Sequence, residues 1–96
     1  MLVHVLDAKY VDGYRIEMLF NDGRKGIADL SEALKGPVFE KLRDQEQFRR
    51  FSVDKELETL VWANGADLAP EYLYFQAFKN DQGLQEKFKK WGYLDN

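Results

Sequence analysis

The N-terminal third of the chain consists of short runs rich in apolar residues, separated by turn residues. Residues 2–11 are rich in β-branched and aromatic types and stop at Asp12-Gly13, a dipeptide suited to a tight hairpin turn. The next run alternates apolar with polar side chains, as in a strand with one face on a core, at Tyr14, Ile16, Met18 and Phe20. A second turn at Asn21-Asp22-Gly23 lets residues 24–30 return. The pattern predicts a three-stranded antiparallel meander.

The middle of the chain combines short helical segments with a second hairpin. Ser31 is predicted to cap one short helical segment, Pro37 fits the first position of a second, and Asp44 is predicted to cap a third. Residues 51–53 and 59–62 are then predicted as two short strands joined by a charged turn.

The last third predicts two helices. Asn64-Gly65 forces a turn, and Pro70 begins the first helix. Leu84, Phe88 and Trp91 recur at helical spacing, which predicts a C-terminal amphipathic helix. Its apolar stripe can pack either on the chain's own sheet, the simpler explanation, or on a partner.

Together these elements predict an α+β fold: a small antiparallel sheet, made of the N-terminal meander plus a second short hairpin, with short helices and the C-terminal amphipathic helix. We expect an α+β domain over residues 1–80 and a helical extension over residues 81–96.

Composition narrows the class of protein. The chain has 96 residues, of which 45% are hydrophobic and 32% charged, which is typical of a soluble domain with one core. Its formal net charge of −3 gives no general attraction to phosphates. No stretch approaches the roughly 20 apolar residues of a membrane span, and the N-terminal segment lacks the basic flank and length of a signal peptide. We therefore expect a cytoplasmic protein without membrane association.

Residue types that carry catalysis or bind metals are scarce. The chain has no cysteine, so it can form neither a disulfide nor a thiolate zinc site. Its single histidine, His4, lies on a predicted strand and cannot form a multi-histidine metal site. We interpret His4 as structural and predict no catalytic residue, no cofactor and no bound metal.

One turn gathers polar groups beside an aromatic ring. Asn64, Asp67 and Glu71 bring an amide and two carboxylates close in sequence, and Trp62 precedes them. Such a set can bind a cation, position a polar ligand or anchor an interface. Turn chemistry, a helix N-terminus and core packing also explain the same residues, and we favour that explanation. The candidates for ligand or partner binding are Trp62, Asn64, Asp67 and Glu71.

Two short stretches, residues 48–51 and 87–91, mix aromatic rings with cations. Rings that stack on bases and cations that pair with phosphates are the ingredients of single-strand nucleic-acid binding. Acidic residues flank both stretches, which favours ordinary solvated surface. The candidates for contact with nucleic acid or a partner are Arg49, Arg50, Lys87, Lys89, Lys90 and Trp91.

Several motifs resemble one bacterial family. Gly36-Pro37-Val38-Phe39, then Trp62-Ala63-Asn64-Gly65-Ala66-Asp67, then Pro70-Glu71 are similar to the family called domain of unknown function 2442. The resemblance runs from the first hairpin to about Tyr74 and implies a small α+β domain, sometimes joined to a helix-turn-helix segment, with no catalytic residue. The family often has a polar capping residue where this chain has Ala69. The resemblance also implies an antitoxin-like partner in a small bacterial gene pair, which is a hint of protein binding.

Our leading hypothesis from the sequence is a non-enzymatic interaction module, antitoxin-like or regulatory. It would bind a protein partner or a second copy of itself through an exposed sheet edge or the C-terminal helix. The alternatives are a regulator that contacts nucleic acid, and a small-ligand or metal-binding domain at the Trp62–Asp67 turn.

Overall fold

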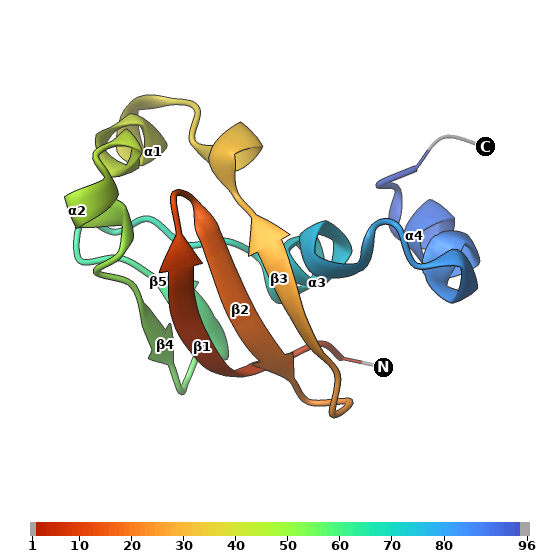
Figure 1. Cartoon of the computed structure of the whole chain (residues 1–96). Helices are drawn as coiled ribbons and strands as arrows, with labels where there is room; N and C mark the ends of the chain where they lie inside the picture. The colour runs from red at the N-terminus through yellow and green to blue at the C-terminus, as the bar shows by residue number, and fades with distance from the viewer. Residues whose placement is uncertain (1, 95–96) are drawn as a thin grey trace.

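The alternating N-terminal pattern forms an antiparallel sheet. A computed structural model describes residues 2–94, and in it β1 (Val5–Asp12), β2 (Arg15–Phe20) and β3 (Lys25–Asp29) pair in the order β1-β2-β3 (Figure 1). A separate hairpin pairs β4 (Ser52–Asp54) with β5 (Thr59–Val61). The predicted α+β class, meander and second hairpin are confirmed.

The register of the sheet places one face of β2 on the core. Ile16, Met18 and Phe20 are fully buried, as their period of two predicts. Ile16 lies opposite Ala28 of β3, which is also fully buried, while Ile27 on the other face is 43% exposed. The sheet is therefore covered on one side only.

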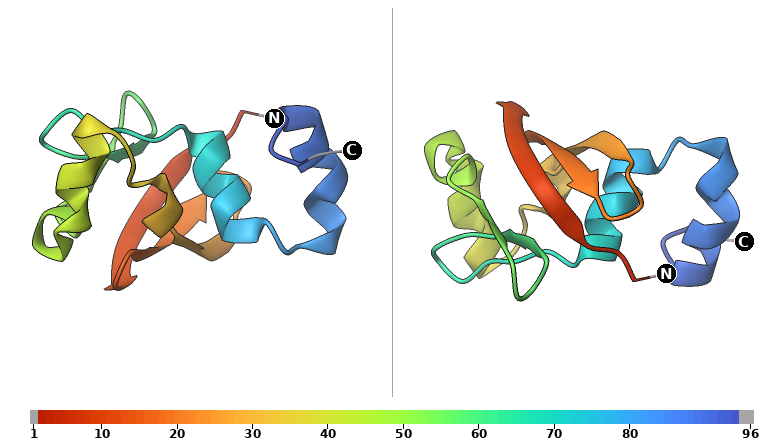
Figure 2. Two further views of the ribbon diagram at one scale, coloured as in Figure 1. Left: turned by 90° about the horizontal axis from the view of Figure 1, so that it is seen from above. Right: turned by 90° about the horizontal axis from the view of Figure 1, so that it is seen from below.

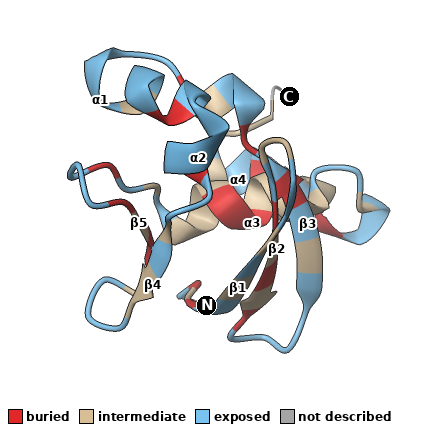
Figure 3. Cartoon of the chain, turned by 60° about the vertical axis from the view of Figure 1, so that its left-hand side comes forward, coloured by how far each residue is buried: buried red, intermediate tan, exposed pale blue. Residues whose placement is uncertain are grey.

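Short helical segments connect and cover the strands. They are η1 (Ser31–Ala33), α1 (Pro37–Glu40), η2 (Lys41–Arg43), α2 (Gln45–Phe48), α3 (Pro70–Phe78), η3 (Gln82–Leu84) and α4 (Gln85–Trp91). The views in Figures 1 and 2 place α1 and α2 at one end of the molecule and α4 at the other. Buried positions gather where α3 lies behind β2 and β3 (Figure 3).

The capping predictions have two different outcomes. Asp44 accepts the N–H of Glu46 at 3.0 Å and begins α2 as predicted. Ser31 is not a cap, because it is the first residue of η1 and Leu30 occupies the N-cap position. The backbone N–H of Ser31 is instead bound by the carboxylate of Asp29, at 3.0 Å.

The C-terminal apolar stripe packs on α3 rather than on the sheet. Phe88 is fully buried, and its ring centroid lies 5.1 Å from that of Phe75. Trp91 lies edge-on to Tyr74 at 5.9 Å. The stripe that the sequence left available for a partner is thus covered within the chain.

Candidate functional site

Trp62, the first of the turn candidates, is a core residue. Its side chain is 4% exposed, and its indole N–H donates to the carbonyl of Phe48 at 2.8 Å. The ring lies between Phe48 and Phe51, with centroid distances of 5.9 and 6.4 Å. This bond fixes α2 to the segment after β5.

Asn64 holds the turn and ties it to α1. Its side-chain oxygen accepts the N–H of Ala66 at 3.1 Å, and its amide nitrogen donates to the carbonyl of Val38 at 3.0 Å. Gly65 has a φ of 91°, which an L side chain rarely adopts, so glycine suits this turn. Both polar groups of Asn64 therefore have structural partners.

The two carboxylates of the same candidate set follow the turn along the chain. Asp67 is exposed and forms an isolated bridge with Val61, and Glu71 lies in the first turn of α3. Among residues 2–94, no group of three or more His, Asp or Glu side chains is arranged to hold a metal ion. The role of Trp62, Asn64, Asp67 and Glu71 in binding a ligand or partner stays a prediction.

Trp62 and Asn64 instead border a hollow that also contains Arg50. This cleft has a volume of about 240 Å³ and lies between the α1–α2 segment and the turn after β5. Its lining residues are Lys41, Leu42, Gln47, Arg50, Trp62, Ala63 and Asn64. The structure thus joins members of two candidate sets that are separate in the sequence.

The remaining cations do not form one surface. Arg49 lies near α2, where it faces Glu46 at 3.6 Å and lies over the ring of Tyr10 at 5.0 Å. Lys87, Lys89 and Lys90 lie on α4, at the opposite end of the molecule (Figure 1).

On α4, these residues already have neighbours within the chain. Lys89 faces Glu86 at 3.6 Å, and Lys87 lies 5.9 Å from the ring centroids of both Tyr74 and Trp91. The two sets of cations predicted to contact nucleic acid are therefore not brought together.

The β3 strand presents an open backbone edge. In the β2–β3 ladder, Phe20 donates to the carbonyl of Arg24, and Leu30 donates to the carbonyl of Tyr14, both at 2.9 Å. Because antiparallel ladders alternate, the even-numbered residues of β3 bond to β2 and the odd-numbered ones point away from it. The outward groups belong to Lys25, Ile27 and Asp29, and no described strand pairs with them.

A groove runs beside this edge. It has a volume of about 440 Å³ and is lined by Ile27 and Asp29 of β3, by Arg15, and by residues 76–81 at the end of α3. Gly26 lets α3 approach closely: a Cβ atom there would lie 2.6 Å from Cε1 of Phe78. The aromatic end of α3 therefore forms one wall of the groove.

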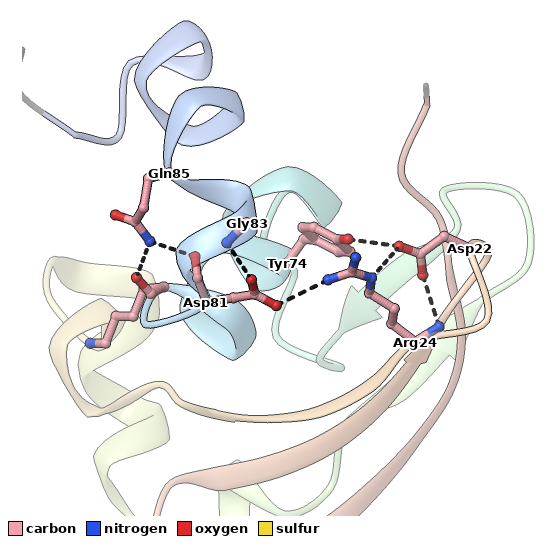
Figure 4. A network of polar contacts seen from close by, with 7 residues as sticks. Asp22, Arg24, Tyr74, Asp81, Gly83 and Gln85 are labelled. Atoms are coloured by element: carbon pink, nitrogen blue, oxygen red, sulfur yellow. Dashed lines mark hydrogen bonds and ion pairs between the residues drawn. The ribbon is translucent and has the colours of Figure 1, made fainter.

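A polar network holds that wall in place (Figure 4). The Tyr74 hydroxyl donates to Asp22 at 2.7 Å, and the Arg24 guanidinium donates to Asp81 at 3.1 Å. Asp81 also accepts the N–H of Gly83 at 2.8 Å. The network connects the β2–β3 turn with the residues that follow α3.

Two pKa shifts follow from this network. Partial burial raises the pKa of Asp22, but the Tyr74 hydroxyl, the Arg24 backbone N–H and the Arg24 charge outweigh it and leave this pKa below its ordinary value. Burial, helped by the Asp22 hydrogen bond, raises the pKa of Tyr74 to about 12. At neutral pH the pair is a carboxylate bound by a neutral phenol.

His4 lies outside both hollows described above. Its imidazole contacts the carboxylate of Glu58, and its backbone N–H donates to the Asn21 side chain at 2.9 Å. These contacts join the start of the chain to two turns, in line with the structural role expected for this residue.

The edge and the groove were missed at the level of individual residues. No candidate site predicted from the sequence included Ile27, Asp29, Lys79 or Asp81, although an exposed sheet edge was expected. One signal was present: the last strand of a meander is an edge unless a later strand joins it, and residues 25–29 alternate lysine, isoleucine and aspartate on one face.

Comparison with known proteins identifies one family. The family described as "Protein of unknown function (DUF2442)" matches residues 5–79, which confirms the resemblance. No curated protein and no solved structure matches the chain. No helix in the described range 2–94 is long and apolar enough to cross a membrane.

Proposed function

The chain belongs to the DUF2442 family, and from that premise we propose that it is a non-enzymatic interaction module that binds an extended segment of a protein partner along β3. The observation that carries this proposal is the row of outward backbone groups at Lys25, Ile27 and Asp29. A partner strand would complete the ladder, as in other domains that recognise peptides by strand addition.

The side chains beside those groups define what the partner strand should carry. Lys25 and Asp29 are exposed charges on either side of the apolar Ile27. In an antiparallel pair, the residues directly opposite them would best be acidic, apolar and basic, in that order. Read along the partner from its N-terminus, the preferred pattern is basic, any residue, apolar, any residue, acidic.

The neighbouring groove supplies room and an apolar contact. Ile27, Ala77 and Phe78 line it together with charged residues at its ends. Side chains of an added strand that point towards α3 can enter this hollow. Main-chain hydrogen bonds then provide affinity, and the side chains opposite Lys25, Ile27 and Asp29 provide specificity.

The proposal can be tested with two peptides whose N- and C-termini are blocked to remove the terminal charges. The first, Thr-Lys-Thr-Val-Thr-Glu-Thr, carries the preferred pattern, and the second exchanges its lysine and glutamate. We expect a titration followed by ¹H–¹⁵N NMR to shift the amide signals of Lys25, Ile27 and Asp29 with the first peptide. The exchanged peptide places like charges opposite Lys25 and Asp29 and should bind several-fold more weakly.

The backbone contribution has its own controls. Methylating the valine nitrogen of the first peptide removes a ladder donor without changing charge. On the protein side, Ile27→Pro removes one outward N–H, whereas Ile27→Ser keeps it. Binding that survives both the methylated peptide and Ile27→Pro, or shifts confined to residues outside β3 and α3, would refute strand addition.

An antitoxin-like or regulatory role would be one form of this function. The partner would then be a small protein that copurifies with the native chain. We expect its recovery to fall with Ile27→Pro and to persist with Ile27→Ser, because the proposed contact depends on the backbone N–H more than on the side chain.

A further inference from the structure

We propose a second site, independent of the β3 edge: the cleft between α1–α2 and the turn after β5 binds the carboxylate of a small organic acid. The cleft is lined by two cations, Lys41 and Arg50, by the amides of Gln47 and Asn64, and by no acidic residue. In a chain of net charge −3, it is therefore a local positive site.

Arg50 provides the main evidence that the cleft binds an anion. Within the described residues, the side chains of the other four arginines each contact a carboxylate or a carbonyl: Arg15 with Asp12, Arg24 with Asp22 and Asp81, Arg43 with Leu34, and Arg49 with Glu46. No such contact is made by Arg50, and none by Lys41, in the same part of the chain. Both charges remain available to a ligand.

The cleft is held in shape before any ligand arrives. The Trp62 indole is bound to the carbonyl of Phe48 at 2.8 Å, and the Asn64 amide is bound to the carbonyl of Val38 at 3.0 Å. These bonds join the two sides of the hollow. A site whose walls are already fixed loses less conformational entropy on binding.

The lining also selects the class of anion. Guanidinium presents a planar pair of N–H donors that matches a carboxylate. Leu42, Trp62 and Ala63 add apolar surface, which suits a carbon body rather than a bare inorganic ion. The volume of about 240 Å³ lies below that of typical drug-sized sites, about 300–1,000 Å³, so the ligand is small.

Benzoate is the probe for this site, with benzamide as the neutral molecule of the same shape. We expect benzoate to produce saturable ¹H–¹⁵N shifts at the Arg50 guanidinium, the Gln47 amide and the Trp62 indole of the full chain. Benzamide should produce much smaller shifts, and inorganic phosphate should bind more weakly than benzoate.

Two neighbouring arginines provide a matched comparison. Arg50→Gln should weaken benzoate binding about tenfold or more, because it removes a charge-assisted hydrogen-bond donor. Arg49→Gln should leave it unchanged, since that residue faces Glu46 and Tyr10. The ¹H–¹⁵N spectra would verify that both variants are folded. Equal shifts with benzamide, tighter binding of phosphate, or unchanged affinity in Arg50→Gln would overturn the proposal.

Discussion

The two edges of the main sheet are built differently. The β1 edge is irregular, with register shifts between Val5 and Asp7 and between Tyr10 and Asp12. It is also partly covered, because Val5 donates to the carbonyl of Glu58 at 2.9 Å and the β4–β5 hairpin lies against it. The β3 edge pairs with β2 in an unbroken register and has no described strand on its other side.

This difference supports the proposal that β3, and not β1, is the edge that binds a partner. Bulges and covering segments are the usual means by which proteins prevent unwanted strand pairing. β1 has both, whereas β3 relies on its short length and on the charges of Lys25 and Asp29. A regular edge that is protected only by its short length and two charges is expected of a strand that binds a partner. The following experiments test this difference between β1 and β3.

The largest expected difference in unfolding free energy is between substitutions at the two kinds of backbone position in β3, those that bond to β2 and those that point outward. Ala28→Pro removes an N–H that bonds to β2 and adds bulk at a fully buried position, so we expect a loss of at least about 2 kcal/mol in unfolding free energy. Ile27→Pro removes an outward N–H and should cost about 1 kcal/mol or less. Urea denaturation of both variants measures the difference, and equal losses would mean that the edge is not open.

Closing the space between β3 and α3 should have the next largest effect. Gly26→Ala places a methyl group against the Phe78 ring, where the present contact leaves no room. We expect a loss of about 1–3 kcal/mol, the usual range for overpacking. Adding Phe78→Leu should recover part of this loss in a double-mutant cycle. Additive losses would show that α3 does not rest on Gly26.

The cover over β1 should be weakened by a turn substitution. The Asp54 carboxylate accepts the N–H groups of Glu56 and Leu57 at 2.8 and 2.9 Å. Asp54→Ala should cost about 1 kcal/mol and speed amide exchange at Val5, while Ala28 keeps its protection. Unchanged exchange at Val5 would argue that the hairpin does not shield β1.

The smallest expected effect concerns the network behind the groove. Because the pKa of Asp22 is lowered in the folded state, its contribution to stability is present above its ordinary pKa of about 3.9 and is lost as pH falls through the folded value. Asp22→Asn should therefore lower the unfolding free energy by about 0.5–1 kcal/mol at pH 7. It should also reduce the slope with which the unfolding free energy falls at acidic pH. Identical slopes in both proteins would contradict this role.

The elements that could be predicted from the sequence are those determined by nearby residues. The period of two over residues 14–20 defined β2, and the side chain of Asp44 defined the start of α2. Ser31 misled because η1 begins at Ser31 itself, and the N–H groups of Ala33 and Leu34 are bound by the backbone carbonyls of Leu30 and Ser31. A residue of capping type predicts a helix start only where backbone carbonyls leave the donors of the first turn free.

The sites depend on contacts distant in sequence, so their assembly could not be predicted. Arg50 and Trp62 belonged to separate candidate sets, and the bond from Trp62 to Phe48 brings them to one cleft. Asp67 was grouped with Asn64 in the sequence, but it is not among the residues that line the cleft. Likewise, an edge strand was foreseeable, but only the placement of α3 creates the groove beside β3.

Residue-resolved amide exchange at β3 tests the central claim most directly. In the free protein, the Ile27 N–H should exchange at close to the rate of an unprotected amide, whereas that of Ala28 should be strongly protected by β2. Adding the Thr-Lys-Thr-Val-Thr-Glu-Thr peptide should slow exchange at Ile27 and leave Ala28 unchanged. Equal protection of both amides in the free monomer, or no slowing at Ile27 when the peptide is bound, would contradict strand addition at β3.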